Sequence, residues 1–146
     1  MSTTGLEIFD KTLQVTNIWL NEIGEDESIG PDKQRAYHAL RAVLGTLRDR
    51  STVEQAFKLS AQLPLLVRGI YWEGYRPTGK PEIIRSRDQF LQKINDALGD
   101  IGPMNPEGCA RAVFEVLERH VPDGEIDDVR EMLPEEIRTL FPSAKA

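Results

Sequence analysis

Apolar residues recur at intervals of three and four along most of this chain, which is the spacing of one face of an α-helix. Over residues 6–23 they form one seam, made of Leu6, Phe9, Leu13, Thr16, Leu20 and Ile23. No stretch of four or more residues alternates at the period of two that a half-buried strand shows. The pattern therefore predicts an all-α fold of about eight helices. Their predicted starts are Leu6, Pro31, Ser51, Pro64, Ser86, Pro106, Glu125 and Pro134.

Several of these starts carry known helix-initiating signals. In a capping box, a Ser or Thr side chain and a Glu or Gln three residues later satisfy two backbone N–H groups at the helix start. Proline fits the first turn because the N–H that it lacks would be unpaired there. The chain has capping-box spacing at Ser51–Glu54 and Ser86–Gln89, a cap at Asn105, and prolines suited to a first turn at Pro31, Pro64 and Pro106. On the fifth helix, the buried side is predicted to hold Phe90, Ile94, Ala97 and Ile101.

The chain contains an internal repeat. Residues 41–71 resemble residues 111–141 at a constant offset of 70, and the identical positions in the first copy are Arg41, Ala42, Val43, Leu47, Leu63, Pro64 and Arg68. Upstream the offset becomes 78, because the second copy has a loop eight residues shorter. We therefore expect residues 1–146 to form one all-α domain of two four-helix halves, about 6–71 and 86–141. Pseudo-two-fold symmetry would relate the halves, and residues 72–85 would join them.

Composition narrows the class of protein. A chain of 146 residues, 40% of them hydrophobic, can bury one core without disulfide or metal support. The formal charge of −6 argues against binding to nucleic acid or to an anionic membrane surface. No apolar run reaches the roughly 20 residues that span a bilayer. The single cysteine, Cys109, suits a reducing compartment and is expected to be a packing residue, so we expect a cytoplasmic protein.

The joint between the halves holds the most unusual composition. Residues 68–87 contain five basic residues against two acidic ones, a charge of +3 within a chain of −6. Three of the ten aromatic residues fall within five positions there. Arginine, tyrosine and tryptophan dominate binding hot spots, so the joint is the candidate binding site. Its candidate residues are Arg68, Tyr71, Trp72, Tyr75, Arg76, Arg85 and Arg87.

Two interpretations of the joint remain open. In the first, the aromatic rings seal the seam between the halves, and the arginines pair with acidic helix ends at residues 127–128 or 135–136. In the second, arginines and rings recognise another protein or an acidic or phosphorylated ligand. The first interpretation predicts a buried Trp72, and the second predicts that Trp72 or Tyr75 is exposed beside Arg76. We expect a buried Trp72 with Tyr75 and Arg76 exposed at its edge. Single-stranded nucleic acid is a third and weaker fit, because the rest of the surface repels phosphate.

The sequence gives no catalytic residue, metal site or cofactor. Gly79-Lys80 lacks the other residues of a phosphate-binding loop. The two histidines, His38 and His120, have no cysteine or glutamate at metal-ligand spacing on the same helix face. We therefore favour a protein-interaction or regulatory module over an enzyme. The alternative is an enzyme, or a domain that binds a small anionic ligand between the two halves.

Two further expectations concern single residues. Arg41 and Arg111 occupy matching places on apolar helices, so each is expected to be at least half-buried and to bridge neighbouring helices. Ile18 and Trp19 lie off the seam of the first helix, whereas the second copy has Asp96 and Ala97 there. This extra apolar strip would be free to contact a second copy, which suggests a homodimer.

Several short motifs together resemble a bacterial family of unknown function numbered 2267. The motifs are Tyr37-x-x-Leu40-Arg41-Ala42-Val43-Leu44, Leu47-Arg48-Asp49-Arg50, Leu63-Pro64, Arg68-Gly69, Tyr71-x-Glu73-Gly74-Tyr75-x-Pro77, Arg85-Ser86-Arg87 with Phe90-Leu91, and Gly124-Glu125 to Leu133-Pro134. The resemblance covers about residues 6–142. It implies a compact all-α bacterial domain, and it brings no activity, ligand or catalytic residue.

Overall fold

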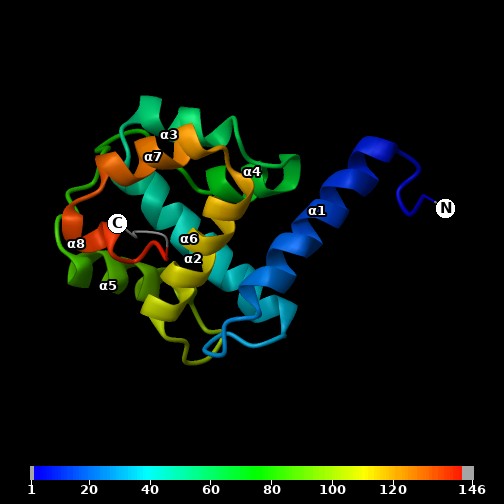
Figure 1. The fold of residues 1–146 in the computed structure, drawn as a ribbon, viewed down its shortest axis with the longest axis horizontal. Coiled ribbons are helices and arrows are strands. Elements are labelled where there is room, and N and C mark those ends of the chain that lie inside the picture. Colours follow the sequence, from blue (N-terminus) through cyan, green and yellow to red (C-terminus); the bar gives the residue numbers. More distant parts are fainter. Residues whose placement is uncertain (1, 143–146) are drawn as a thin grey trace.

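The computed structural model describes residues 2–142 of the 146-residue chain. This part contains eight helices and no strand (Figure 1), so the all-α prediction is confirmed. None of these helices has the length and apolar character needed to cross a membrane. The helices are α1 (Glu7–Ile23), α2 (Lys33–Arg50), α3 (Val53–Ser60), α4 (Leu65–Trp72), α5 (Arg87–Leu98), α6 (Pro106–His120), α7 (Asp123–Met132) and α8 (Glu135–Arg138).

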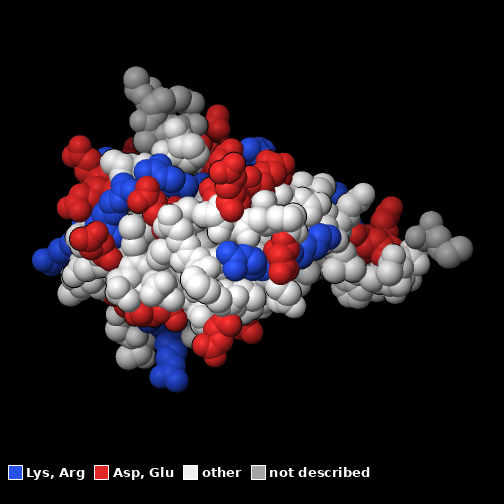
Figure 2. Space-filling model, turned by 90° about the horizontal axis from the view of Figure 1, so that it is seen from below, with Lys and Arg blue, Asp and Glu red and all other residues white. Residues whose placement is uncertain are grey.

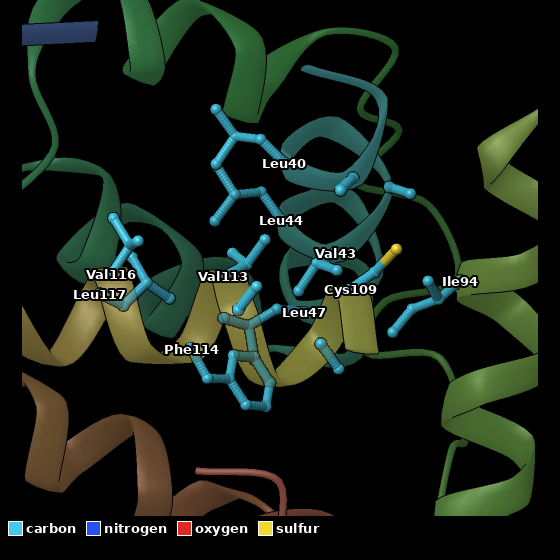
Figure 3. Packing of buried hydrophobic residues seen from close by; sticks show 14 of the residues in the cluster. Leu40, Val43, Leu44, Leu47, Ile94, Cys109, Val113, Phe114, Val116 and Leu117 are labelled. Carbon is cyan, nitrogen blue, oxygen red and sulfur yellow. The ribbon is translucent and has the colours of Figure 1, made fainter. Parts of the chain in front are cut away.

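The core forms where α2 and α6 pack against each other. Each helix has a wide apolar face, and Figure 3 shows Leu44 and Leu47 of α2 beside Val113 and Phe114 of α6. The ring of Phe114 stacks on Phe141 with 4.1 Å between ring centroids. Helices α1 and α5 both pack on the α2–α6 pair, while α3 packs on α7. The joint therefore lies between elements that pack on this pair directly, such as α4 and α5 on α2.

Most predicted helix starts are confirmed, and one capping box is displaced by a residue. Ser86 accepts from the N–H of Gln89 at 3.1 Å, as its spacing predicted, and Asn105 caps α6. At α3, however, the box is Thr52 with Gln55 rather than Ser51 with Glu54. The reason is that Ser51 is buried at the end of α2, where its hydroxyl donates to the carbonyl of Leu47 at 2.8 Å.

Pro106 is the first residue of α6, as predicted, whereas the other first-turn prolines lie just outside their helices. Pro64 and Pro134 are the N-cap residues of α4 and α8, and both have φ −57° and ψ 153°. Before α2 the cap is Asp32 rather than Pro31, because the Asp32 carboxylate accepts from the N–H of Gln34. These shifts of one or two residues leave the order of the helices unchanged. Helix α7 likewise starts at Asp123, two residues earlier than predicted.

The seam predicted on the first helix is only partly buried. Its C-terminal half, with Thr16 and Ile23, packs into the core, but Leu6, Phe9 and Leu13 are exposed. Figure 1 shows why, since the N-terminal half of α1 extends beyond the body of the fold. The expectation that Trp19 is exposed is wrong. Its side chain is 1% exposed and stacks on His120 of α6 at 5.4 Å between ring centroids.

Two other burial predictions also need correction. Ala97 of α5 is exposed and its neighbour Leu98 is buried instead, so the buried face of α5 is rotated by one residue at its end. Arg41 is exposed rather than half-buried, although it does connect two helices through a 3.6 Å ion pair with Glu73. Arg111 is half-buried as expected and donates to the carbonyl of Thr139 at 3.2 Å.

Candidate functional site

The joint leaves the end of α4 and folds back across the end of α2. Gly74 and Gly79 have φ values of 74° and 79°, a region that favours glycine, so they set two sharp turns. The backbone N–H of Glu82 then donates to the carbonyl of Asp49 at 2.8 Å. Arg50 adds a second tie, because its Nε donates to the carbonyl of Ile84 at 3.2 Å. The joint is thus fixed to the last turn of α2.

A buried arginine organises this region. Arg48 is 7% exposed, and its Nη1 donates to the carbonyl oxygens of Tyr71 at 2.7 Å and Glu73 at 2.9 Å. Its Nη2 pairs with Asp49 at 2.9 Å, and the guanidinium lies 5.2 Å from the ring centroid of Tyr75. The last carbonyls of a helix have no partner within the helix, so Arg48 both caps α4 and holds the first turn of the joint. Arg48 was not among the predicted site residues.

Four aromatic rings pack together beside Arg48, and Trp72 contacts each of the other three, Phe57, Tyr71 and Tyr75. Trp72 lies 4.7 Å from Phe57 and 5.0 Å from both Tyr71 and Tyr75, measured between ring centroids. Tyr71 is fully buried, and its hydroxyl donates to the carbonyl of Ala56 at 3.0 Å. Burial raises the pKa of Tyr71 well above its ordinary value. Tyr71 is therefore a neutral core residue rather than part of an accessible surface.

The other three rings reach the surface, and we call Phe57, Trp72 and Tyr75 the aromatic ridge. Phe57 is 60% exposed, whereas Trp72 and Tyr75 are half-buried. The indole Nε1 of Trp72 donates to the hydroxyl of Ser60 at 2.7 Å. Trp72 was expected to be buried and Tyr75 exposed, so both predictions are only half right. Phe57, the most exposed ring, comes from α3 and was not among the predicted site residues.

The basic residues of the joint separate into two groups. Arg68 donates to the carbonyls of Ser60 at 3.1 Å and Leu63 at 2.9 Å, so it caps the end of α3. Arg87 pairs with Glu107 of α6 at 2.8 Å, apart from the ridge. This pairing partly agrees with the sealing interpretation, although the partner is not one of the predicted acidic helix ends. Hydrogen bonds from Arg87 and Arg111 hold the pKa of Glu107 below its ordinary value.

Arg76 and Arg85 form the second group. Both are exposed, and neither makes an ion pair with any residue between 2 and 142. Arg76 follows Tyr75 directly, so it lies at the end of the aromatic ridge. The structure therefore brings Trp72, Tyr75 and Arg76 together and gives structural contacts to Arg68, Tyr71 and Arg87. The binding role of these residues stays a prediction.

A charged hollow of about 420 Å³ lies beside the joint, between α2, α4 and α5. Its lining includes the small residues Ala42 and Gly45, the Arg48–Asp49 pair, and the charged residues Arg41, Glu73, Lys93 and Asp96. Arg41 and Lys93 also have partners, since Arg41 pairs with Glu73 and Lys93 pairs with Glu82 at 2.8 Å. An anion that entered this hollow would have to compete with those carboxylates.

Metal-binding clusters and the single cysteine are the other places where chemistry could occur. Within residues 2–142, no group of three or more histidine, cysteine, aspartate or glutamate side chains is arranged to hold a metal ion. Cys109 is buried, as expected for a packing residue, and burial raises the pKa of its thiol to about 11. The thiol is therefore protonated near neutral pH and is a poor nucleophile.

Comparison with known proteins agrees with the motifs in the sequence. The family model described as "Uncharacterized conserved protein (DUF2267)" matches residues 16–140, which is most of the chain. No curated protein matches the chain. The description of the family names no activity, ligand or partner. Function must therefore be argued from the geometry of this chain.

Proposed function

The chain belongs to the DUF2267 family of uncharacterised conserved proteins, and we propose that it serves as a protein-interaction module whose recognition surface is the aromatic ridge with Arg76 and Arg85. The observation that carries the proposal is the exposed ring of Phe57, 4.7 Å from a half-buried Trp72. One exposed and two half-buried aromatic rings, beside an arginine that has no ion pair with residues 2–142, match the composition of binding hot spots.

The chemistry of the ridge favours an acidic segment of a partner protein that also carries an apolar side chain. Apolar contact would come from Phe57 and Trp72, and the guanidinium of Arg76 would pair with a carboxylate or phosphate. The hydroxyl of Tyr75 is buried, so Tyr75 would contribute its ring rather than its hydroxyl to the ridge. Figure 2 shows acidic and basic side chains intermixed on one face, which does not suit a nucleic-acid backbone.

The alternative is a small anionic ligand bound between the two halves, as substrate or effector. The hollow between α2, α4 and α5 is the place where it would bind. Because Arg41 and Lys93 already pair with carboxylates there, we favour the ridge, where Arg76 has no such pair within the described part of the chain. Ligand-induced protection of Lys93 from acetylation, with none at the ridge, would favour the alternative.

Affinity capture from the native cell tests the proposal. We expect reversal of charge at Arg76→Glu and Arg85→Glu together to reduce recovery of a specific partner at least about 10-fold, because two favourable charge pairs become repulsive. Phe57→Ala is expected to reduce recovery similarly. Both changes lie at exposed positions, so the unfolding midpoint should stay near that of the wild type.

Lys33→Glu is the matched control, because it reverses an exposed charge at the start of α2. Helix α2 has 18 residues and is about 27 Å long, so Lys33 lies far from the joint at the other end. A partner lost from the ridge variants but kept by Lys33→Glu supports the proposal. Recovery of the same proteins by all variants would refute the ridge as the recognition surface.

We also infer that the two halves, about 6–71 and 86–141, are copies of one unit within a single domain. Their matching prolines have the same backbone angles, and Arg138 donates to the carbonyl of Leu133 at 2.8 Å much as Arg68 does to Leu63. The helix contacts fit a pseudo-two-fold axis, since α2 meets α6 and α3 meets α7. Failure of residues 41–71 to superpose on 111–141 would contradict this inference.

A further inference from the structure

The exposed apolar residues of the chain gather at one end of the molecule. Ten large apolar side chains are exposed among the described residues, and seven of them lie on α1, at its N-cap or at the start of α4. We call six of these the arm surface. The arm surface consists of Leu6, Ile8, Phe9, Leu13, Leu65 and Leu66. Scattered single apolar residues are ordinary on a protein surface, but a concentration of this kind marks an interaction site.

The two parts of the arm surface belong to one continuous region. Helices α1 and α4 are in contact, and the backbone N–H of Leu66 donates to the hydroxyl of Thr12 at 3.0 Å. Thr12 lies between Phe9 and Leu13 along α1, so Leu66 is brought to the same region as these two side chains. Figures 1 and 2 show, from two directions, that the N-terminal end of α1 projects from the body of the fold. Among residues 2–142, the first turns of α1 thus lack a partner that covers Leu6, Ile8 and Phe9.

The size of this surface fits an interface between two copies. The six side chains are each 39–62% exposed, and together they present on the order of 500 Å² of apolar surface. Two such surfaces brought together would bury about 1,000 Å² of apolar area, and a polar rim would bring the total into the range of a standard interface, about 1,200–2,000 Å². The apolar area of such a dimer alone therefore comes close to the lower end of that range.

We propose that the arm surface binds the arm surface of a second copy of this chain, which gives a two-fold symmetric dimer. In such an interface the same surface serves on both sides, so an apolar surface faces an apolar surface without any other protein. Phe9 and Leu13 have the spacing with which one helix packs against another. The first turns of α1 also carry charges of both signs, at Glu7 and Lys11.

The carboxylate of Asp10, next to the arm surface, is held by hydrogen bonds within its own chain. It accepts from the N–H of Thr4 at 3.0 Å and from the hydroxyls of Thr4 and Ser2. Those hydrogen bonds, first from Ser2 and then from Thr4, lower the pKa of Asp10. The dimer does not involve the aromatic ridge, so it can be tested without reference to the proposed partner protein.

Light scattering with size-exclusion chromatography, followed by sedimentation equilibrium, measures the mass directly. We expect a species of twice 16.5 kDa at about 100 µM. The double variant Phe9→Glu and Leu66→Glu should raise the dissociation constant of the dimer at least about 100-fold, because it would bury four uncompensated carboxylates. Both residues are 39% or more exposed in one copy, so helix content by circular dichroism should stay unchanged.

Ile83→Glu is the control, because Ile83 is 74% exposed but lies in the joint rather than in the arm surface. Loss of the dimer in the arm variant, with the dimer retained in Ile83→Glu, supports the proposal. A wild-type mass of one chain at about 100 µM overturns it. A dimer that survives the double variant, or an assembly that keeps growing beyond two copies, overturns it as well.

Discussion

Replacing Arg48 by alanine is expected to lower the free energy of unfolding by about 3–5 kcal/mol, a large share of the stability of a domain of this size. The substitution removes the donor that serves two carbonyl oxygens, those of Tyr71 and Glu73, and it leaves Asp49 without its cation. Buried acceptors that lose their donors keep the full cost of desolvation. Urea unfolding followed by the helical circular dichroism signal measures the change.

Two further variants separate the loss of the Arg48 contacts from a general effect of removing a positive charge. Arg41→Ala removes an exposed arginine whose pair with Glu73 is 3.6 Å long, so its expected cost is within about 1 kcal/mol. Arg48→Lys keeps the charge, but an ammonium group cannot reproduce the planar fork that reaches two carbonyls and a carboxylate. We expect Arg48→Lys to recover only part of the loss. If Arg48→Ala lowered the free energy of unfolding no more than Arg41→Ala does, the Arg48 contacts would not be what holds the joint.

The helices could be predicted from the sequence because helical periodicity is a local property. How far a helix extends beyond the core is not a local property. This explains the main error on α1, the predicted burial of its N-terminal half. The seam showed which side of α1 is apolar, but only packing against α2 and α6 decides which part of that side is buried. Trp19 lies off the seam and is nevertheless buried, because His120, which is 101 residues later, supplies a ring to stack on.

The joint could be found in the sequence because its aromatic and basic residues are adjacent along the chain. Their roles could not be separated there, since Arg87 is bound by Glu107 and Arg68 by backbone carbonyls. Phe57 was missed because it reaches the ridge from another helix. Arg48 did leave a signal, since it lies four residues after the buried Leu44, and a charged residue on an apolar helix face requires a partner.

Truncating Trp72 to alanine is expected to lower the free energy of unfolding by roughly 2–4 kcal/mol, near or just below the cost for a fully buried tryptophan. The indole ring contacts Phe57, Tyr71 and Tyr75, and its Nε1 donates to the buried hydroxyl of Ser60. Because Trp72 is only half-buried, part of its ring is already in water and contributes less. Equilibrium urea unfolding gives the value, with Trp72→Phe as the variant that keeps a ring.

The two roles of the joint can be separated by comparing stability with binding at neighbouring rings. Trp72→Phe should lose about 1 kcal/mol with its hydrogen bond and still bind the partner, since a ring remains in the ridge. Phe57→Ala, at a position 60% exposed, should reduce binding with little change in stability. If Trp72→Ala abolished capture while Phe57→Ala did not, binding would have failed because the joint had loosened. The aromatic residues would then seal the seam between the two halves rather than recognise a partner.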